Sequence, residues 1–283
     1  MKFKLYCFPA SKTLLFTVVL SLLIVACDTK KEKEPEEIRQ MVEMVTDKGT
    51  MRIALYNETP QHRDNFLKLA REGAYDRLLF HRVIENFMVQ GGDPESKTAQ
   101  AGDTLGNGDL DYTVPAEFHP DLFHKKGALA AARTGNPERA SSSMQFYLVQ
   151  GRVLTDSLLT LAENTINEWL AEHYLIHDPR YKELYEGLKK ADSAQDWRQF
   201  RTLQDSVRKM ATTYTNFDRY TIPPAQREVY KTVGGTAFLD QNYTVYGEVV
   251  QGLNVIDSIA KVDTGDMNRP LEDVRILKIR VVE

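Results

Sequence analysis

The stretch FHRVIENFMVQGGDP, residues 80–94, carries the strongest indication of the fold of this chain. It is mostly apolar and typical of extended chain, yet Arg82 brings a fixed positive charge into it. Side chains alternate between the two faces of a strand, so Arg82, Met88 and Gln90 share one face if the turn near Glu85–Asn86 keeps the register. The stretch therefore predicts a surface that combines a guanidinium, a polarizable apolar side chain and an amide.

A surface arginine paired with a carboxylate is the simplest alternative, and it would leave the neighbouring apolar residues as ordinary core. The segment SMQFYLVQ, residues 143–150, favours a binding surface, because it supplies a second amide at Gln145. The same segment adds two rings, Phe146 and Tyr147. Neither stretch has a Ser-His-Asp order or a His/Cys spacing typical of metal sites, so we expect no metal ion and no cofactor.

The flanking sequence predicts a β-rich domain. Alternating runs at 41–47 and 49–57 indicate a hairpin, and Pro60 after Thr59 starts a helix over 60–72. Further strands are expected within 78–91, near 111–116, and at 126–133, 143–151, 243–250 and 274–282, with a second helix at 253–262.

Residues 152–235 break this pattern. They are polar and charged, and their apolar residues recur at helical spacing. The first such stripe consists of Leu158, Leu161, Ile166, Trp169 and Leu170. More helices are expected near 180–190 and 194–214, and a short one after Pro223–Pro224. We therefore expect an α-helical insertion over 152–235 between two parts of the β domain, 41–151 and 236–283.

The N-terminal region predicts a secretory signal over residues 1–26, because lysines precede an apolar run that is short for a membrane span. The sequence IVAC, residues 24–27, resembles a bacterial lipobox, in which Cys27 becomes the lipidated N-terminus. An ordinary signal peptide or an uncleaved anchor is the alternative. Residues 27–40 are charged and predict a tether. The formal net charge of −4 does not favour nucleic acid as a partner.

Residues 80–94 resemble the signature of the cyclophilin-type peptidyl-prolyl isomerases, Phe-His-Arg followed by Phe-Met-x-Gln-Gly-Gly-Asp. GALAAARTGNP (127–137), SMQFYLV (143–149) and FLDQNYTVYGEVVQGLNVIDSI (238–259) resemble further family segments in family order. The resemblance covers about 42–151 and 234–283. It implies a mainly β fold, a closed eight-stranded antiparallel barrel capped by two helices.

The resemblance also implies the chemistry: an isomerase of X–Pro bonds with Arg82 as the catalytic residue and proline-containing polypeptides as partners. His81 lies in the motif, but we expect a structural role for it. The residues that match substrate-binding positions are Phe87, Met88, Gln90, Ala132, Arg133, Gln145, Phe146, Tyr147, Phe238, Leu239 and Tyr243.

Three of these positions depart from the best-known family pattern. Phe238 stands where many eukaryotic members have the Trp that is tied to cyclosporin binding, so we expect weak cyclosporin affinity. Tyr243 stands at a position often held by His, and Tyr147 replaces a Phe and adds a hydroxyl. None of these changes removes Arg82.

The combined expectation is a lipid-anchored isomerase that assists folding of unfolded or nascent proteins in a bacterial cell envelope, facing the periplasm or the exterior. The alternative is a binding module of negligible turnover that acts as a chaperone through the helical insertion. For the insertion itself, a decorated loop packed on the barrel and a lid or client-binding arm both remain open, and its apolar face could also form a dimer contact.

Overall fold

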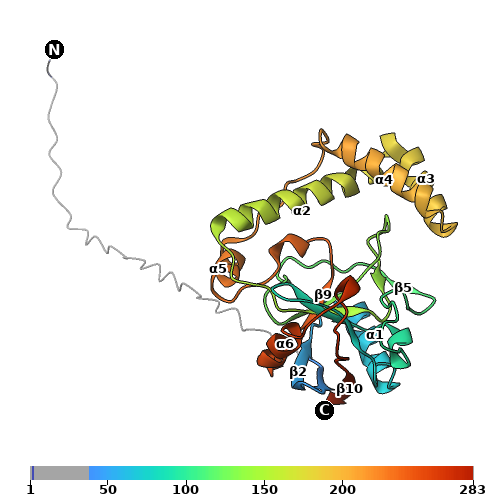
Figure 1. Ribbon diagram of the computed structural model, residues 1–283. Helices are drawn as coiled ribbons and strands as arrows, with labels where there is room; N and C mark the ends of the chain where they lie inside the picture. Colours follow the sequence, from blue (N-terminus) through green and yellow to red (C-terminus); the bar gives the residue numbers. More distant parts are fainter. Residues whose placement is uncertain (1, 3–37, 283) are drawn as a thin grey trace. The chain divides into compact units, whose positions relative to one another are not determined.

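In the computed structural model, which describes residue 2 and residues 38–282, strands pair antiparallel in the order β10-β1-β2-β9-β6-β8-β4-β3 (Figure 1). The strands of this sheet are β1 (Met41–Thr46), β2 (Gly49–Leu55), β3 (Phe80–Ile84), β4 (Met88–Gly91), β6 (Ala128–Ala131), β8 (Phe146–Val149), β9 (Val245–Gln251) and β10 (Ile276–Val282). The helices are α1 (Pro60–Arg71), α2 (Asp156–His177), α3 (Lys182–Ser193), α4 (Trp197–Ala211), α5 (Pro224–Thr232) and α6 (Leu253–Ala260).

The predicted hairpin, strands and two flanking helices are confirmed at this level, and the fold is mainly β with added helices. The short strand expected near 111–116 is β5 (Thr113–Val114). Its partner β7 (Ser141–Ser142) was not predicted, and the two form a second, two-stranded sheet. The 3-10 turns η1 (Pro94–Lys97), η2 (Pro179–Tyr181), η3 (Ala237–Leu239) and η4 (Asp266–Asn268) complete the described part.

The expected closure of the barrel is not confirmed. Ladder pairing runs from β10 to β3, and these two edge strands do not form a ladder with each other. They approach only where they begin, through an isolated bridge between Leu79 and Arg275. Beside it, the Phe80 amide donates to the Val274 carbonyl over 2.9 Å. The sheet is therefore curved until its edges meet at one end, and it is not sealed along their length.

Alternation along the central strands sends side chains into two separate apolar clusters. On β8, Phe146 and Leu148 enter one cluster, while Tyr147 and Val149 enter the other. The inner cluster holds the first pair with side chains of α1 and α6, including Phe66, Leu67, Val255, Ile256 and Ile259. The outer cluster consists of Tyr56, Met88, Ala128, Ala130, Ala132, Tyr147, Val149, Leu239 and Val245, with partly buried Ile84, Phe87, Leu122, Trp169, Phe238 and Tyr243.

Helices α2 to α5 occupy the expected insertion, between β8 and η3. Its two ends meet, because the amide of Gly235 donates to the carbonyl of Arg152 over 3.1 Å and the two residues form an isolated bridge. The long helix α2 then links two packed regions. Its first half packs Leu159 against α5 and η3, and its last half builds a small separate core with Leu188 of α3 and Phe200 of α4. Figure 1 shows α2 running above the sheet toward α3 and α4.

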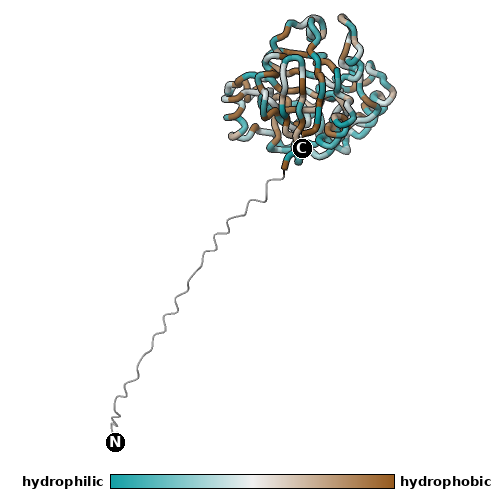
Figure 2. Tube along the Cα trace, turned by 90° about the horizontal axis from the view of Figure 1, so that it is seen from below, coloured by the Kyte–Doolittle hydropathy of each residue, from teal (hydrophilic) through white to brown (hydrophobic). Residues whose placement is uncertain are grey.

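The predicted signal over 1–26, the lipidated Cys27 and most of the tether lie outside the described residues. In the part of the chain that is described, no helix is both long enough and apolar enough to cross a bilayer. Figure 2 shows apolar and polar stretches alternating along the chain trace of the described domain.

Candidate active site

Arg82 and Gln90 are directly paired on β3 and β4. The Nη1 of Arg82 donates to the side-chain oxygen of Gln90 over 3.2 Å, and the amide nitrogen of Gln90 donates to the side-chain oxygen of Gln145 over 3.0 Å. The register also places Ile84 opposite Met88, so the turn keeps Arg82, Met88 and Gln90 on one face, as the sequence predicts.

The far end of this chain of amides is anchored to the backbone. The side-chain nitrogen of Gln145 donates to the carbonyls of Gly106 and Gly108, over 3.0 and 2.8 Å. Each amide is thereby oriented, with its oxygen toward the arginine side. Burial lowers the pKa of Arg82 from its ordinary value, but a guanidinium remains charged at any physiological pH. The result is a fixed, half-buried cation whose remaining donors are available to a ligand.

The outer cluster lies on the same face of the sheet as Arg82. Met88, Tyr147 and Leu239 are buried within it, while Phe87 is only partly buried. Phe87 stacks on Phe238 with ring centroids 5.7 Å apart. These residues come from β4, β8 and η3, and the structure brings all of them together beside the arginine.

The helical insertion adds a residue that the sequence did not identify as part of the site. Trp169, on α2, packs edge to face on Phe238 with ring centroids 6.4 Å apart. In sequence it is only one member of an amphipathic stripe, so nothing local separates it from ordinary helix packing. Only the structure joins it to the outer cluster.

Arg133 and Tyr243 form the opposite side of the site. The guanidinium of Arg133 lies over the Tyr243 ring, 4.8 Å from its centroid, and its Nη2 donates to the side-chain oxygen of Asn242 over 2.8 Å. Arg133 Nε donates to the Asn242 carbonyl over 3.1 Å. Ala132, the residue before it, is buried in the outer cluster. Both residues thus lie beside the outer cluster, and their part in substrate binding stays a prediction.

Phe146 is the exception among the predicted residues. Its side chain is fully buried in the inner cluster, on the opposite face of β8 from Tyr147. It contacts Phe66 edge to face at 5.7 Å, so it supports the core and cannot line a surface site. Strand alternation separates these neighbours, and the prediction that both rings belong to the site is corrected for Phe146.

The Tyr147 hydroxyl does not point to the ligand side. It lies 2.9 Å from Nε2 of His124, whose Nδ1 lies 2.8 Å from Asp240. The hydroxyl of Tyr230, on α5, donates to the other oxygen of Asp240 over 2.7 Å. This buried network ties the insertion to the wall of the site, and only its Tyr147 was singled out from the sequence.

His81 is buried, and burial lowers its pKa to about 4, helped by the nearby charges of Arg82 and Arg269. Neither ring nitrogen has a hydrogen-bond partner among the described residues. The imidazole is therefore neutral at physiological pH. Within the same described part, no group of His, Cys, Asp or Glu side chains is arranged to hold a metal ion.

Comparison with known proteins agrees with this geometry. The family model for "Cyclophilin type peptidyl-prolyl cis-trans isomerase/CLD" matches residues 41–175 and 224–281. The gap between these two matched ranges, 176–223, contains α3 and α4.

Relatives with curated descriptions include a candidate peptidyl-prolyl cis-trans isomerase of Staphylococcus aureus (strain COL), 29% identical over 254 residues that cover 89% of this chain and 96% of that protein. A candidate of the same kind from Staphylococcus haemolyticus is 28% identical over 252 residues, covering 89% and 94%. Among solved structures, a Cryptosporidium parvum cyclophilin-type isomerase aligns with a TM-score of 0.48 and 16% identity, over 87% of this chain and 99% of that one.

Proposed function

The chain belongs to the cyclophilin-type peptidyl-prolyl cis-trans isomerases, and from that membership we propose that it isomerises X–Pro bonds in polypeptides with Arg82 as its catalytic residue. The observation that carries this proposal is the position of Arg82, whose guanidinium is held by Gln90 beside the outer cluster.

The reaction needs no bond to break. Rotation about an X–Pro amide is opposed by a barrier of ~18–20 kcal/mol that arises from amide resonance. The two planar isomers differ by only ~0.5–1 kcal/mol, so an enzyme has only to bind the twisted amide better than either of them.

Twisting the amide localises the lone pair on the prolyl nitrogen. A guanidinium that is already oriented can donate a hydrogen bond to that nitrogen with little rearrangement. The proline ring would meanwhile contact Phe87, Met88 and Leu239, and the substrate backbone would contact Gln90, Gln145 and the backbone of Arg133. A proline ring is apolar, and these three side chains offer it a largely dehydrated surface.

The test is an isomerisation assay on an Ala-Pro peptide, by protease coupling or by NMR exchange. Wild type is compared with Arg82→Ala and with Arg280→Ala, which removes an exposed arginine from β10 and so matches the charge change. We expect kcat/KM to fall about 10²–10³-fold in Arg82→Ala, because an oriented donor to the transition state is lost, and to stay unchanged in Arg280→Ala. Wild type no faster than buffer overturns the proposal.

We further propose that the enzyme acts outside the cytoplasm, anchored through Cys27 and facing the bacterial periplasm or exterior, on unfolded or nascent envelope proteins. The support is the lysine-rich start, the short apolar run and the IVAC sequence. Metabolic labelling with a fatty acid tests it, with Cys27→Ser as the matched variant and Cys7→Ser as the control. Labelling that survives in Cys27→Ser, or that never occurs, contradicts the anchor.

A second candidate function, binding of unfolded polypeptides by the helices, is supported by their exposed apolar side chains. The apolar side chains of Leu161 and Trp197 are 61% and 49% exposed to solvent. Suppression of aggregation of a denatured protein should weaken in Leu161→Ser with Trp197→Ser while Ala-Pro isomerisation is retained. Unchanged suppression by the double variant contradicts this function.

A further inference from the structure

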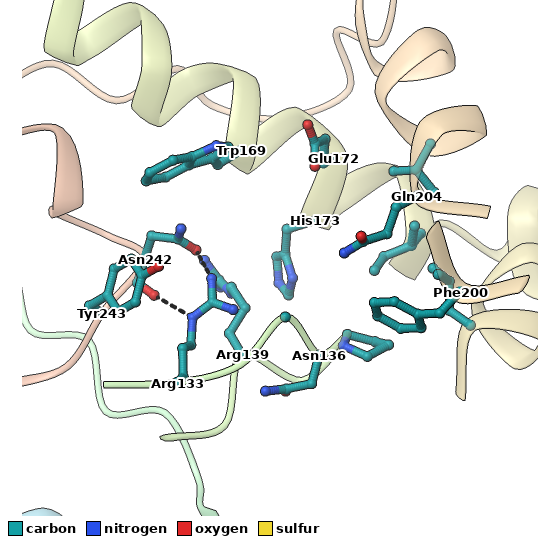
Figure 3. A pocket seen from close by; sticks show the side chains of 15 residues that line it. Arg133, Asn136, Arg139, Trp169, Glu172, His173, Phe200, Gln204, Asn242 and Tyr243 are labelled. Atoms are coloured by element: carbon teal, nitrogen blue, oxygen red, sulfur yellow. Dashed lines mark hydrogen bonds between the residues drawn. The ribbon is translucent and has the colours of Figure 1, made fainter. Parts of the chain in front are cut away.

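A cavity of about 260 Å³ lies between the loop that follows β6 and the helices α2, α3 and α4 (Figure 3). The loop contributes Arg133 and Arg139 to its wall, while α2 contributes Trp169 and His173. Phe200 of α4 lies across from them. The cavity thus depends on the helical insertion for most of one side.

This cavity adjoins the candidate active site, because the two share walls. Trp169 and Tyr243 line the cavity, and both also belong to the outer cluster beside Arg82. An extended polypeptide advances at most ~3.3–3.6 Å per residue, so a side chain only a few residues from a bound proline can reach a neighbouring pocket. A substrate that crosses Tyr243 therefore meets the cavity next.

The arginines of the cavity have no acidic partner. Neither Arg133 nor Arg139 lies within 4.0 Å of a carboxylate of the described residues. Arg139 donates through Nη1 to the Gln241 carbonyl over 2.9 Å, while its buried Nε has no partner in the same part of the chain. Burial, together with the charge of Arg133, lowers the pKa of Arg139 to about 10. Two half-buried like charges thus face one space.

The other titratable groups of the cavity do not cancel this charge. Burial and the charge of Arg139 lower the pKa of His173 to about 3, so its ring is neutral at physiological pH. The charge of Glu172 is balanced by Arg208 of α4, whose Nε lies 3.9 Å from the carboxylate. Burial raises the pKa of Glu172. In Figure 3, Glu172 lies toward Gln204, whereas His173 points toward Arg139. The electrostatic potential on the loop side of the cavity is therefore positive.

We propose that this cavity is an accessory substrate subsite that binds an acidic side chain, Asp or Glu, a few residues from the proline. This inference rests on the proposed function, because it assumes that a proline-containing polypeptide occupies the outer cluster. A carboxylate accepts hydrogen bonds from a guanidinium in pairs, and it would relieve the repulsion between Arg133 and Arg139. Its amide counterpart has the same shape but lacks the charge, so discrimination between Glu and Gln identifies the subsite.

The chain offers a direct reporter of binding. It has two tryptophans, Trp169 and Trp197, and Trp197 is exposed on α4. In a Trp197→Phe background, the fluorescence of Trp169 reports only on the wall between the outer cluster and the cavity. The probes are proline peptides with a single Glu at the second, third or fourth position from the proline on either side, each paired with the same peptide carrying Gln.

We expect Glu to lower Kd about tenfold relative to Gln at one of these positions, as for one charge-assisted pair. Arg139→Gln should abolish this preference, while Arg198→Gln, an equal charge change at an exposed position of α4 outside the cavity wall, should retain it. Equal Kd values for every Glu and Gln pair overturn the inference, and so does a preference that survives Arg139→Gln. Because fluorescence needs no turnover, failure of the subsite is distinct from failure of isomerisation, which the Ala-Pro assay measures separately.

Discussion

Arg82 and Gln90 face each other across neighbouring strands, and the arginine donates to the amide oxygen over 3.2 Å. The same amide donates onward to Gln145, so its orientation is fixed from both sides. An amide fixed in this way holds the guanidinium without neutralising it. A carboxylate in its place would hold the arginine as firmly but would compete for its donors.

Replacing the amide tests this role. Gln90→Glu should lower kcat/KM for an Ala-Pro peptide by about tenfold or more, because an ion pair draws the Arg82 donors away from the substrate. Gln90→Leu should also lower it, through loss of orientation. Gln251→Glu, an exposed change on β9, is the control for added charge. Full activity in Gln90→Glu would show that the arginine does not depend on this amide.

The second glycine of the Gly91-Gly92 pair should tolerate no side chain. Gly92 has φ +94°, and a Cβ there would lie 2.2 Å from the carbonyl oxygen of Met144. We expect Gly92→Ala to lower the free energy of unfolding by about 3 kcal/mol or more, measured by denaturant titration. Gly102→Ala is the matched control, since Gly102 has φ +91° with nothing within 4 Å of its Cβ. It should cost about 1 kcal/mol, and equal losses would rule out the close approach as the cause.

The buried network behind the site should contribute to stability. Tyr230→Phe removes the hydroxyl that donates to Asp240, whose carboxylate is only 2% exposed. We expect a loss of about 1–3 kcal/mol in the free energy of unfolding, because a buried acceptor is left without that donor. Tyr112→Phe removes an exposed hydroxyl that donates to Asn65, and it should change stability by less than about 0.5 kcal/mol. A Tyr230→Phe protein as stable as wild type contradicts the prediction.

Burial of His81 should make stability fall at mildly acidic pH. Its pKa drops from the ordinary 6.5 to about 4 on folding, so between these values the unfolded chain binds a proton that the folded chain does not. The free energy of unfolding should therefore decrease as pH falls from about 6.5 to 4, by on the order of 3 kcal/mol. Urea unfolding at a series of pH values measures this dependence.

His173 has a lowered pKa as well, so the contribution of His81 must be isolated by difference. His81→Gln should flatten the dependence between pH 6.5 and 4 relative to wild type, while retaining the part that comes from His173. An NMR titration of the wild-type imidazole gives a second reading. A His81 ring that titrates near 6.5 in the folded protein refutes the prediction.

Local patterns in the sequence account for much of the fold. The hairpin over 41–57 and helix α1 follow from alternation and from Pro60 after Thr59, and both appear as predicted. The face shared by Arg82 and Gln90 also follows from strand alternation. The same rule places Phe146 and Tyr147 on opposite faces of β8, so strand alternation excludes a site that both rings line.

Long-range relationships could not be predicted in this way. Trp169 contacts Phe238 across a large sequence separation. The apolar stripe of its helix does not indicate which residue Trp169 contacts. The meeting of β3 with β10 at a single bridge likewise depends on the curvature of the whole sheet. Pairing of β5 with β7 depends on strands too short to show alternation.

The meeting of Arg152 and Gly235 has an evolutionary consequence. Because the backbone leaves and re-enters the sheet at one bridge, β8 and η3 experience the whole excursion much as they would a tight turn. The entropic cost of closing a loop rises only with the logarithm of its length. Helices can therefore be added or lost between Arg152 and Gly235 with little effect on strand register. Natural selection can thus change which polypeptides the helices contact while the pairing of Arg82 with Gln90 is kept.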